Sequence, residues 1–269
     1  MTREIPLFQV DAFTTHAFAG NPAAVCPLHA WLPDALMQSI AAENNLAETA
    51  FFVPEGDGFR LRWFTPTTEV ELCGHATLAS AFVLMTELEP ARTHAVFFTR
   101  SGPLTVTRVG ALFEMDFPSR SPAPTSEPMT AVAEALGATP SLILEAASLM
   151  AVFDHAAVVR TLRPNIAAIA GLDTHAVIVT APGDGTDADV DFVSRYFAPK
   201  FGVPEDPVTG SAHCTLTPYW AGRLGRSDLR ARQVSARGGE LACGWRGARV
   251  SLAGHAVMVI RGTISLPST

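Results

Sequence analysis

One pattern occurs twice in this chain: Arg62-Trp63-Phe64-Thr65-Pro66 followed by Cys73-Gly74-His75-Ala76-Thr77, and later Arg195-Tyr196-Phe197-Ala198-Pro199 followed by Thr209-Gly210-Ser211-Ala212-His213. Each copy predicts a strand, a turn and then an apolar helix that opens on a glycine. The two glycines are separated by about half of the 269 residues. This spacing predicts two similar halves that face each other across a cleft, an arrangement typical of enzymes that act on small molecules.

The composition indicates a globular protein with a sizeable buried core. Apolar residues make up 48% of the chain, and the formal net charge is −7. Arginines gather around Arg223, Arg226, Arg230 and Arg232, but no aromatic residues are interleaved with them, so we expect no nucleic-acid partner. The N-terminus lacks a signal-peptide pattern, and every apolar run is well short of the roughly 20 residues of a membrane helix. We therefore expect a cytoplasmic protein with no membrane association.

The cysteine, histidine and lysine patterns indicate neither a disulfide framework nor a cofactor. Cys26, Cys73, Cys214 and Cys243 are widely scattered, so we expect free thiols. The eight histidines show no zinc-motif spacing, and no dinucleotide or P-loop pattern occurs. Lys200, the only lysine, lies in a turn, where a solvated side chain is more typical than a Schiff base with pyridoxal phosphate. We expect no metal and no cofactor.

The predicted elements follow a similar order in both halves. In the first half we expect strands at 5–13, 23–27, 46–53, 59–65, 96–98, 104–109 and 112–117, and helices at 33–44 and from 74 to just before 90. In the second half we expect helices at 130–136, 166–172 and 211–223, strands at 151–159 and 176–180, a turn at 183–185 and a meander over 233–262.

The proline-rich segment 119–128 is the best linker in the sequence. It places a boundary between an N-terminal half, residues 1–118, and a C-terminal half, residues 119–269, with the last strand free to cross over to the first half. The prediction is an α+β duplication, in which each half wraps mostly antiparallel strands around one principal helix.

Both copies of the repeated pattern predict a site for negative charge. A helix start on a glycine exposes unpaired backbone N–H groups and the positive end of the helix dipole. In the second copy Asp206, Thr209 and Ser211 crowd around this start, and helix capping accounts for one of them but not for all three.

Two residues of the first half are candidates for proton transfer. His75 lies just inside the helix start, where the dipole is expected to keep its imidazole neutral. Glu48 enters a strand with apolar neighbours, and burial there is expected to raise its pKa towards the range of a general acid/base.

Five ordered motifs resemble the PhzF-like phenazine-biosynthesis isomerase family. They are Phe18-Ala19-Gly20-Asn21-Pro22, Asn45-Leu46-Ala47-Glu48-Thr49, Arg62-Trp63-Phe64-Thr65-Pro66, Cys73-Gly74-His75-Ala76-Thr77 and Glu205-Asp206-Pro207-Val208-Thr209-Gly210-Ser211-Ala212. The likeness extends to the region of Arg237-Gly238-Gly239 and Gly254, so it covers essentially the whole chain.

The resemblance implies the diaminopimelate-epimerase-like fold, a homodimer and cofactor-free chemistry on a small carboxylate, cyclic or amino-acid-like. In the type enzyme of the family the reaction is the isomerisation of trans-2,3-dihydro-3-hydroxyanthranilate. One glutamate, matched by Glu48, moves a proton between two ring carbons, and the matching His75, Asp206 and Ser211 complete the catalytic set. The adjoining motif positions are the expected substrate-binding residues: Asn21, Cys73, Gly74, Ala76, Thr209, Gly210 and Ala212.

Two other functions stay open from the sequence. The first is cofactor-independent amino-acid epimerisation, with Cys73 or Glu48 opposed by an acid such as Asp206 on the other face of the substrate. A mechanism with two thiols fits less well, because Cys214 falls inside the second helix. The other is a non-catalytic protein that binds a small acid, against which the filled catalytic positions argue. The motifs do not specify the physiological substrate.

Overall fold

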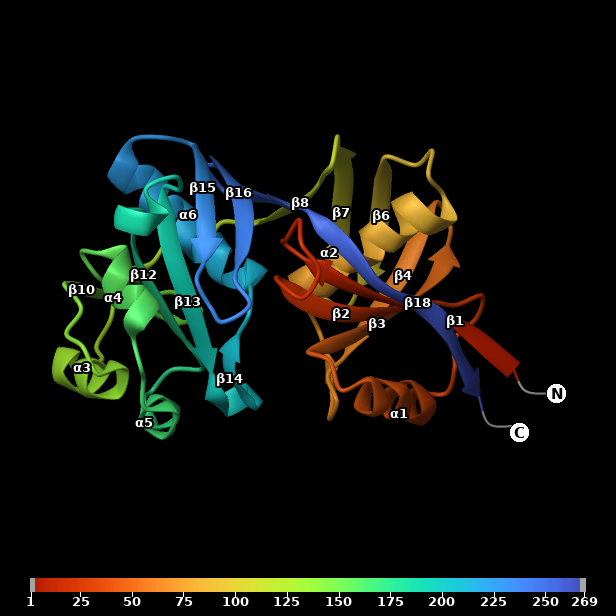
Figure 1. Ribbon diagram of the computed structural model, residues 1–269, viewed down its shortest axis with the longest axis horizontal. Helices are drawn as coiled ribbons and strands as arrows, with labels where there is room; N and C mark the ends of the chain where they lie inside the picture. Colours follow the sequence, from red (N-terminus) through yellow and green to blue (C-terminus); the bar gives the residue numbers. More distant parts are fainter. Residues whose placement is uncertain (1–2, 267–269) are drawn as a thin grey trace. The chain divides into compact units, whose positions relative to one another are not determined.

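The computed structural model describes residues 3–266. The chain divides into two compact units, Met1–Asp116 with Ala253–Thr269, and Phe117–Leu252. The sequence placed residues 119–269 in the second half and left the last strand free to cross over. In the structure this strand, β18 (Ala256–Leu266), pairs antiparallel with β1 (Arg3–Ala12) of the first unit, and the two run side by side in Figure 1.

The first unit contains the following elements besides β1 and β18: β2 (Asn21–Pro27), α1 (Asp34–Asn44), β3 (Glu48–Glu55), β4 (Gly58–Phe64), β5 (Glu69–Val70), α2 (Gly74–Val83), η1 (Leu84–Leu88), β6 (His94–Thr99), β7 (Gly102–Val109) and β8 (Leu112–Pro118), which ends just inside the second unit. The second unit contains β9 (Ala123–Pro124), α3 (Met129–Leu136), β10 (Leu142–Glu145), β11 (Leu149–Val152), α4 (Ala156–Thr161), α5 (Ile166–Gly171), β12 (Val177–Pro182), η2 (Gly185–Asp187), β13 (Phe192–Ala198), η3 (Pro199–Phe201), β14 (Val203–Asp206), α6 (Gly210–Leu224), β15 (Asp228–Gln233), β16 (Gly239–Arg246) and most of β17 (Arg249–Gly254).

The two units pair their strands in the same order. In the first unit β2 is parallel to β3, β3 is antiparallel to β4, β4 is antiparallel to β5 and parallel to β6, and β6 is antiparallel to β7. In the second unit the same series joins β11, β12, β13, β14, β15 and β16. In each series the helix that follows the short strand opens on the glycine of the repeated pattern. The predicted α+β duplication is therefore confirmed.

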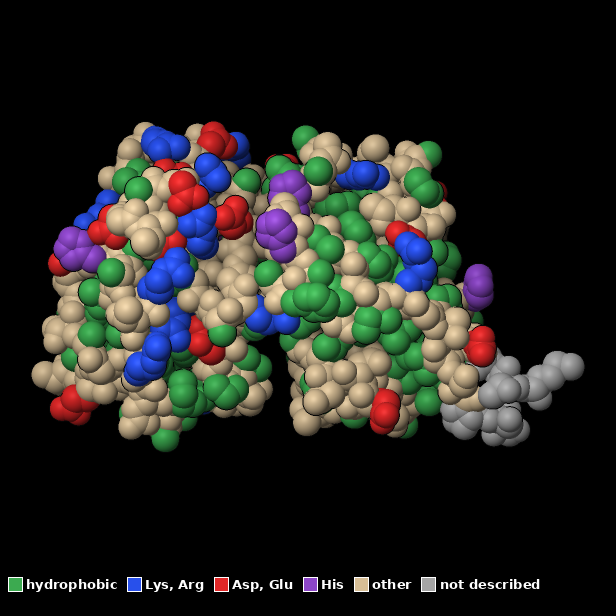
Figure 2. Space-filling view, viewed as in Figure 1, with side chains coloured by type: hydrophobic (Ala, Val, Ile, Leu, Met, Phe, Trp, Pro, Cys, Tyr) green, Lys and Arg blue, Asp and Glu red, His purple; other side chains and the backbone are tan. Residues whose placement is uncertain are grey.

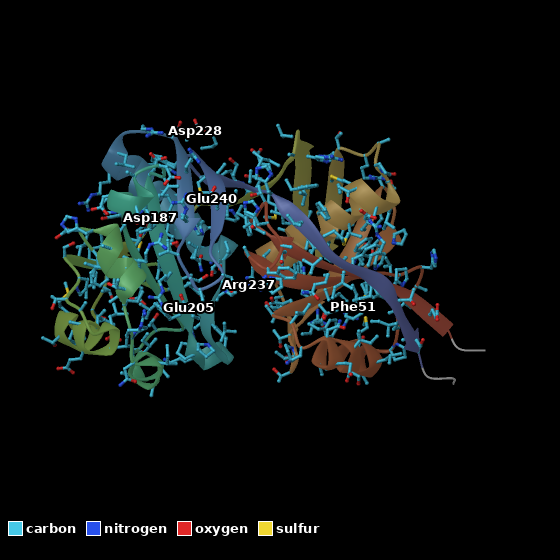
Figure 3. All side chains as sticks on the ribbon, in the orientation of Figure 1. Phe51, Asp187, Glu205, Asp228, Arg237 and Glu240 are labelled. Atoms are coloured by element: carbon cyan, nitrogen blue, oxygen red, sulfur yellow. The ribbon has the colours of Figure 1, made fainter. Side chains whose placement is uncertain are left out.

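Each unit places a largely buried helix against its strands. In the first unit α2 contacts β1, β2 and β3, and eight of its residues are buried. Phe51, labelled in Figure 3, points to the opposite face of β3 and joins a core cluster that includes Met37 and Ile40 of α1. In the second unit α6 contacts β15 and β16, and ten of its residues are buried. No helix within residues 3–266 is long and apolar enough to cross a bilayer.

The arginine of each repeated pattern fastens the strand to the turn that leads into the helix. Arg62 donates from Nε and Nη2 to the two carboxylate oxygens of Glu69, at 2.7 and 2.9 Å. Arg195 makes the same pair of bonds to Glu205, labelled in Figure 3, at 2.7 and 2.9 Å. Each guanidinium also lies over the phenylalanine ring two positions along, 5.2 and 5.0 Å from its centre. The repeated residues thus make the same contacts in both units.

One predicted strand is wrong. The segment 151–159 was expected to be a single strand, but β11 ends at Val152 and α4 begins at Ala156. Asp184 accepts a hydrogen bond from the Ala156 amide at 2.9 Å and lies 2.8 Å from His155 Nδ1, so a distant loop stabilises the helix start. The expected turn at 183–185 accordingly opens into a longer connection that contains η2.

We expect the Arg195 clamp to contribute strongly to stability. The guanidinium is buried and also donates to the carbonyls of Val159 and Leu162, so Arg195→Met leaves several buried groups unpaired. The free energy of unfolding in urea is expected to fall by about 3 kcal/mol. Arg60, which makes a similar two-bond pair with Glu55 at the surface, is the control, and Arg60→Met is expected to change little. Equal effects of the two variants would show that burial of the clamp is unimportant.

Candidate functional site

Four of the predicted site residues of the first unit lie at or next to the first residues of two strands and one helix. Asn21 begins β2, Glu48 begins the parallel strand β3, Cys73 precedes α2 and His75 lies in the first turn of α2. The entry to β2 requires a glycine at position 20, because its φ is +66° and a Cβ there would lie 2.2 Å from a backbone oxygen. The fold therefore brings together side chains that are far apart in sequence.

His75 is at the centre of this group. Its Nε2 lies 3.1 Å from Glu48 Oε2, and its Nδ1 lies 3.2 Å from Asn21 Nδ2 and 3.5 Å from Cys73 Sγ. The His75 side chain is 7% exposed and that of Glu48 18%. Although His75 Nε2 and Glu48 Oε2 are within ion-pair distance, neither atom has an aligned hydrogen bond to the described residues. Both buried atoms thus retain hydrogen-bonding capacity for a bound molecule.

The charges in this group correct two expectations. Burial alone would raise the pKa of Glu48, but His75 holds it below its ordinary value, with a smaller contribution from a hydrogen bond to Cys73. Burial alone would lower the pKa of His75, but its electrostatic interactions and hydrogen bonds with Cys73 and Glu48 hold that pKa well above its ordinary value. Both directions are opposite to those predicted from the sequence, which were a raised pKa for Glu48 and a neutral His75. The geometry instead favours a Glu48 carboxylate beside a His75 imidazolium.

Cys73 has a thiol that is uncharged near neutral pH. Burial, reinforced by the charge of Glu48, raises the pKa of Cys73 to about 11. Glu48, Cys73 and His75 each offer one possible ligand atom, and these atoms lie within 4.8 Å of one another. Oxygen, sulfur and nitrogen are ligand types that zinc accepts, so these three residues are where this unit could hold a metal ion. Sequence spacing could not reveal the set, because Glu48 is remote from the other two residues.

The predicted residues of the second unit gather at the start of α6. Thr209 precedes the helix, but its hydroxyl donates to Asp206 Oδ2 at 2.5 Å instead of capping the helix. Gly210 and Ala212 are buried, and Ser211 is exposed. The helix start therefore has no side-chain cap, like that of α2, and its first N–H groups can bind an anion.

Gln233 holds this turn together and was missed from the sequence. Its Oε1 accepts from the Thr209 amide at 2.9 Å, and its Nε2 donates to the Asp206 carbonyl at 2.7 Å and to Thr209 Oγ1 at 3.2 Å. A signal was present, since Leu229, Ala231 and Gln233 alternate on the buried face of β15. A buried polar side chain at an apolar position indicates a specific set of hydrogen bonds.

Two of the four arginines in the predicted cluster of this unit, Arg226 and Arg232, are paired with acids. Arg232 bonds Asp187, Asp189 and Glu240, and Arg226 bonds Asp191. Figure 2 shows basic and acidic side chains interspersed over this unit, and Figure 3 labels Asp187 and Glu240. Arg226 and Arg232 are therefore held in ion pairs with this unit's own acids.

Comparison with known proteins identifies the family. The family model described as phenazine biosynthesis-like protein, PhzC-PhzF, matches residues 10–262. The chain belongs to this family. The PhzC-PhzF assignment confirms the resemblance noted in the sequence. An uncharacterized isomerase of Pseudomonas aeruginosa is 49% identical over 98% of this chain and 100% of its own length.

A solved structure of a PhzF family protein agrees with this family assignment. The crystal structure of a PhzF family phenazine biosynthesis protein from Enterococcus faecalis matches with a TM-score of 0.95 and 45% identity, over 98% of this chain and 100% of that one. A hydroxyproline epimerase from Agrobacterium vitis matches with a TM-score of 0.62 at 10% identity, over 98% of this chain and 93% of that one. At that identity the second match shows a shared fold only.

We expect the pKa of His75 to depend on Glu48. In an NMR titration His75 is expected to lose its proton well above 6.5, its ordinary value. Glu48→Gln is expected to lower that pKa, because one of the two groups that oppose the effect of burial is lost. His213 is the internal control, since burial lowers its pKa to about 4. A His75 pKa unchanged by Glu48→Gln would contradict the ion pair.

The same shifts predict how the pair affects stability. The raised pKa of His75 gives a contribution that is complete below about pH 6.5 and is lost as pH rises through the folded-state pKa. The lowered pKa of Glu48 gives a contribution that is present above about pH 4.5 and is lost as pH falls through the folded-state pKa. The free energy of unfolding in urea, measured for wild type and Glu48→Gln at pH values below 4.5, between 4.5 and 6.5, and above 6.5, tests both losses of stability.

We expect Gln233→Leu to loosen the turn before α6. The change leaves the Thr209 amide and the Asp206 carbonyl without their buried partner, at a cost of about 2 kcal/mol. Hydrogen exchange of the Thr209 amide is expected to accelerate more than that of Val179, a buried amide of β12. Unchanged protection of Thr209 would show that Gln233 does not hold the turn.

Proposed function

We propose that this protein is a cofactor-independent isomerase that moves a proton between carbons of a small carboxylate-bearing substrate, cyclic or amino-acid-like, with Glu48 as the general acid/base. The observation that carries this proposal is the buried pair of Glu48 and His75 at 3.1 Å. A lowered pKa keeps Glu48 ionised near neutral pH, so it is in the form that accepts a proton from carbon.

The neighbours of Glu48 suit the charge that develops in such a reaction. Removal of a proton beside a carboxylate or a conjugated system leaves negative charge spread over the substrate. A protonated His75 and the uncapped start of α2 are donors for that charge. Glu48 then returns the proton at a second carbon and regains its initial state, so the balanced reaction needs no redox partner.

The second unit contributes Asp206 and Ser211 to the same reaction in this proposal, as the family resemblance implies. Asn21, Cys73, Gly74, Ala76, Thr209, Gly210 and Ala212 stay the proposed substrate-binding set. A homodimer and a cytoplasmic location are further proposals from the resemblance.

We expect Glu48→Gln to abolish proton exchange with solvent. The purified protein is incubated in heavy water with candidate small acids, including dihydro-3-hydroxyanthranilate, and deuterium incorporation is followed by NMR and mass spectrometry. Wild type is expected to incorporate deuterium, and the variant to lose at least about a hundredfold in rate. Glu43→Gln, an exposed glutamate of α1, is the matched control. Exchange that survives in Glu48→Gln would remove Glu48 from the mechanism.

One contact favours a second candidate, amino-acid epimerisation. Cys73 Sγ lies 3.5 Å from His75 Nδ1, a geometry in which a neutral His75 imidazole could take the thiol proton. The pKa of Cys73, raised to about 11 chiefly by burial, weighs against it, as does Cys214, which lies buried within α6. Loss of exchange in Cys73→Ser with retention in Glu48→Gln would favour the epimerase. Binding of a small acid by wild type without any exchange would favour the non-catalytic alternative.

A further inference from the structure

The second unit contains a pocket beside the start of α6 that the proton-transfer chemistry does not explain. Its volume is about 200 Å³, smaller than the roughly 300–1,000 Å³ of pockets for drug-sized ligands. Apolar side chains form part of the wall, among them Ile178 of β12 and Phe201 of η3, whose ring stacks on His175. Ser211 and Ala212 place the pocket at the helix start. A molecule about the size of benzoic acid matches this volume.

The pocket carries a positive charge that is not neutralised. Arg120 lines it and is exposed, and its side chain makes no ion pair or hydrogen bond with the residues that the structure describes. Arg195, Arg226 and Arg232 of the same unit all pair with carboxylates. Within the described part of the chain no aspartate or glutamate lines the pocket. A cation at a pocket without acidic residues favours an anionic ligand.

Two hydroxyl groups add hydrogen-bond donors to this cation. Tyr196 and Ser148 both line the pocket, and their oxygens lie 3.5 Å apart. Burial raises the pKa of Tyr196, so the phenol keeps its proton and can donate it. Tyr196 occupies the position of Trp63 in the repeated pattern, and Trp63 is fully buried. The second unit therefore has a hydroxyl at a pocket where the first has a buried indole.

We propose that this pocket binds the carboxylate end of a small organic acid, with Arg120 as the cationic partner, Tyr196 and Ser148 as donors, and Ile178 and Phe201 against the apolar body of the acid. That this acid is the substrate rests on the proposed function. Arg120 is then the residue that selects acids over neutral analogues.

Benzoate and its neutral analogue benzamide test the pocket by isothermal titration calorimetry on the full chain. Benzoate is expected to bind at least about tenfold more tightly than benzamide, and Arg120→Gln to weaken benzoate binding by at least about tenfold. Arg230→Gln removes an exposed arginine of β15 outside the pocket and is expected to change nothing. Ala147→Phe fills the exposed rim of the pocket without removing the charge, and is expected to abolish binding.

The outcomes separate this proposal from the proposed function. Glu48→Gln is expected to bind benzoate as wild type does while losing deuterium exchange. Arg120→Gln is expected to raise KM for exchange and leave kcat within about threefold, because the charge binds the acid without moving the proton. Exchange that persists in Glu48→Gln would overturn the proposed function but leave the pocket intact. Equal benzoate affinity in wild type and Arg120→Gln, or no benzoate binding by wild type, would overturn the pocket.

Discussion

The two-bond arginine–glutamate clamp is the contact on which both units depend. Arg62 and Arg195 each join the strand of the repeated pattern to the short strand before the central helix, through Glu69 and Glu205. The two arginine side chains are largely buried, at 16% and 10% exposure, so loss of either glutamate would leave a charge with little water around it. The clamps fix the turn from which each helix starts. Because neither helix has a side-chain cap, the position of its free N–H groups follows from that turn.

The electrostatics of the first unit show why local sequence reasoning misjudged His75. A helix dipole contributes about 0.3–1 kcal/mol, and at most about 2 kcal/mol, to the charge state of a residue at its end. A carboxylate about 3 Å away contributes on the order of 5 kcal/mol at an effective dielectric constant of about 20. The nearby charge therefore outweighs the dipole. The sequence shows that His75 follows a helix-opening glycine, but it does not show that Glu48, on another element, lies 3.1 Å from the ring.

The same distinction between local and long-range contacts accounts for the other successes and failures. The two copies of the pattern predicted the duplication. The helix predicted over 211–223 is present as α6, which ends at Gly225 in the left-handed conformation. The strand expected over 151–159 failed, because the start of α4 is stabilised by Asp184 from a remote loop. Gln233 and Arg120 also act across long sequence distances, the first on Asp206 and Thr209, the second at a pocket built from several elements. Periodicity and spacing in the sequence indicate which residues are neighbours within one helix or strand. They do not reveal these contacts, because each of the contacts joins different elements.

Register comparison of the two units bears on the number of catalytic bases. Thr49 pairs with Phe64 in the first unit, and Val177 pairs with Phe197, the matching phenylalanine, in the second. Thr49 and Val177 therefore occupy equivalent positions. The residue before Thr49 is Glu48, whereas the residue before Val177 is Ala176. Duplication thus supplied the backbone twice, but the carboxylate occurs at this position only once. A racemase working from two faces needs a proton-transferring group on each side, whereas an isomerase that removes and returns one proton needs a single carboxylate. The second unit has instead developed a turn that fixes Asp206 and a pocket with an unpaired cation, features that favour binding over a second proton transfer.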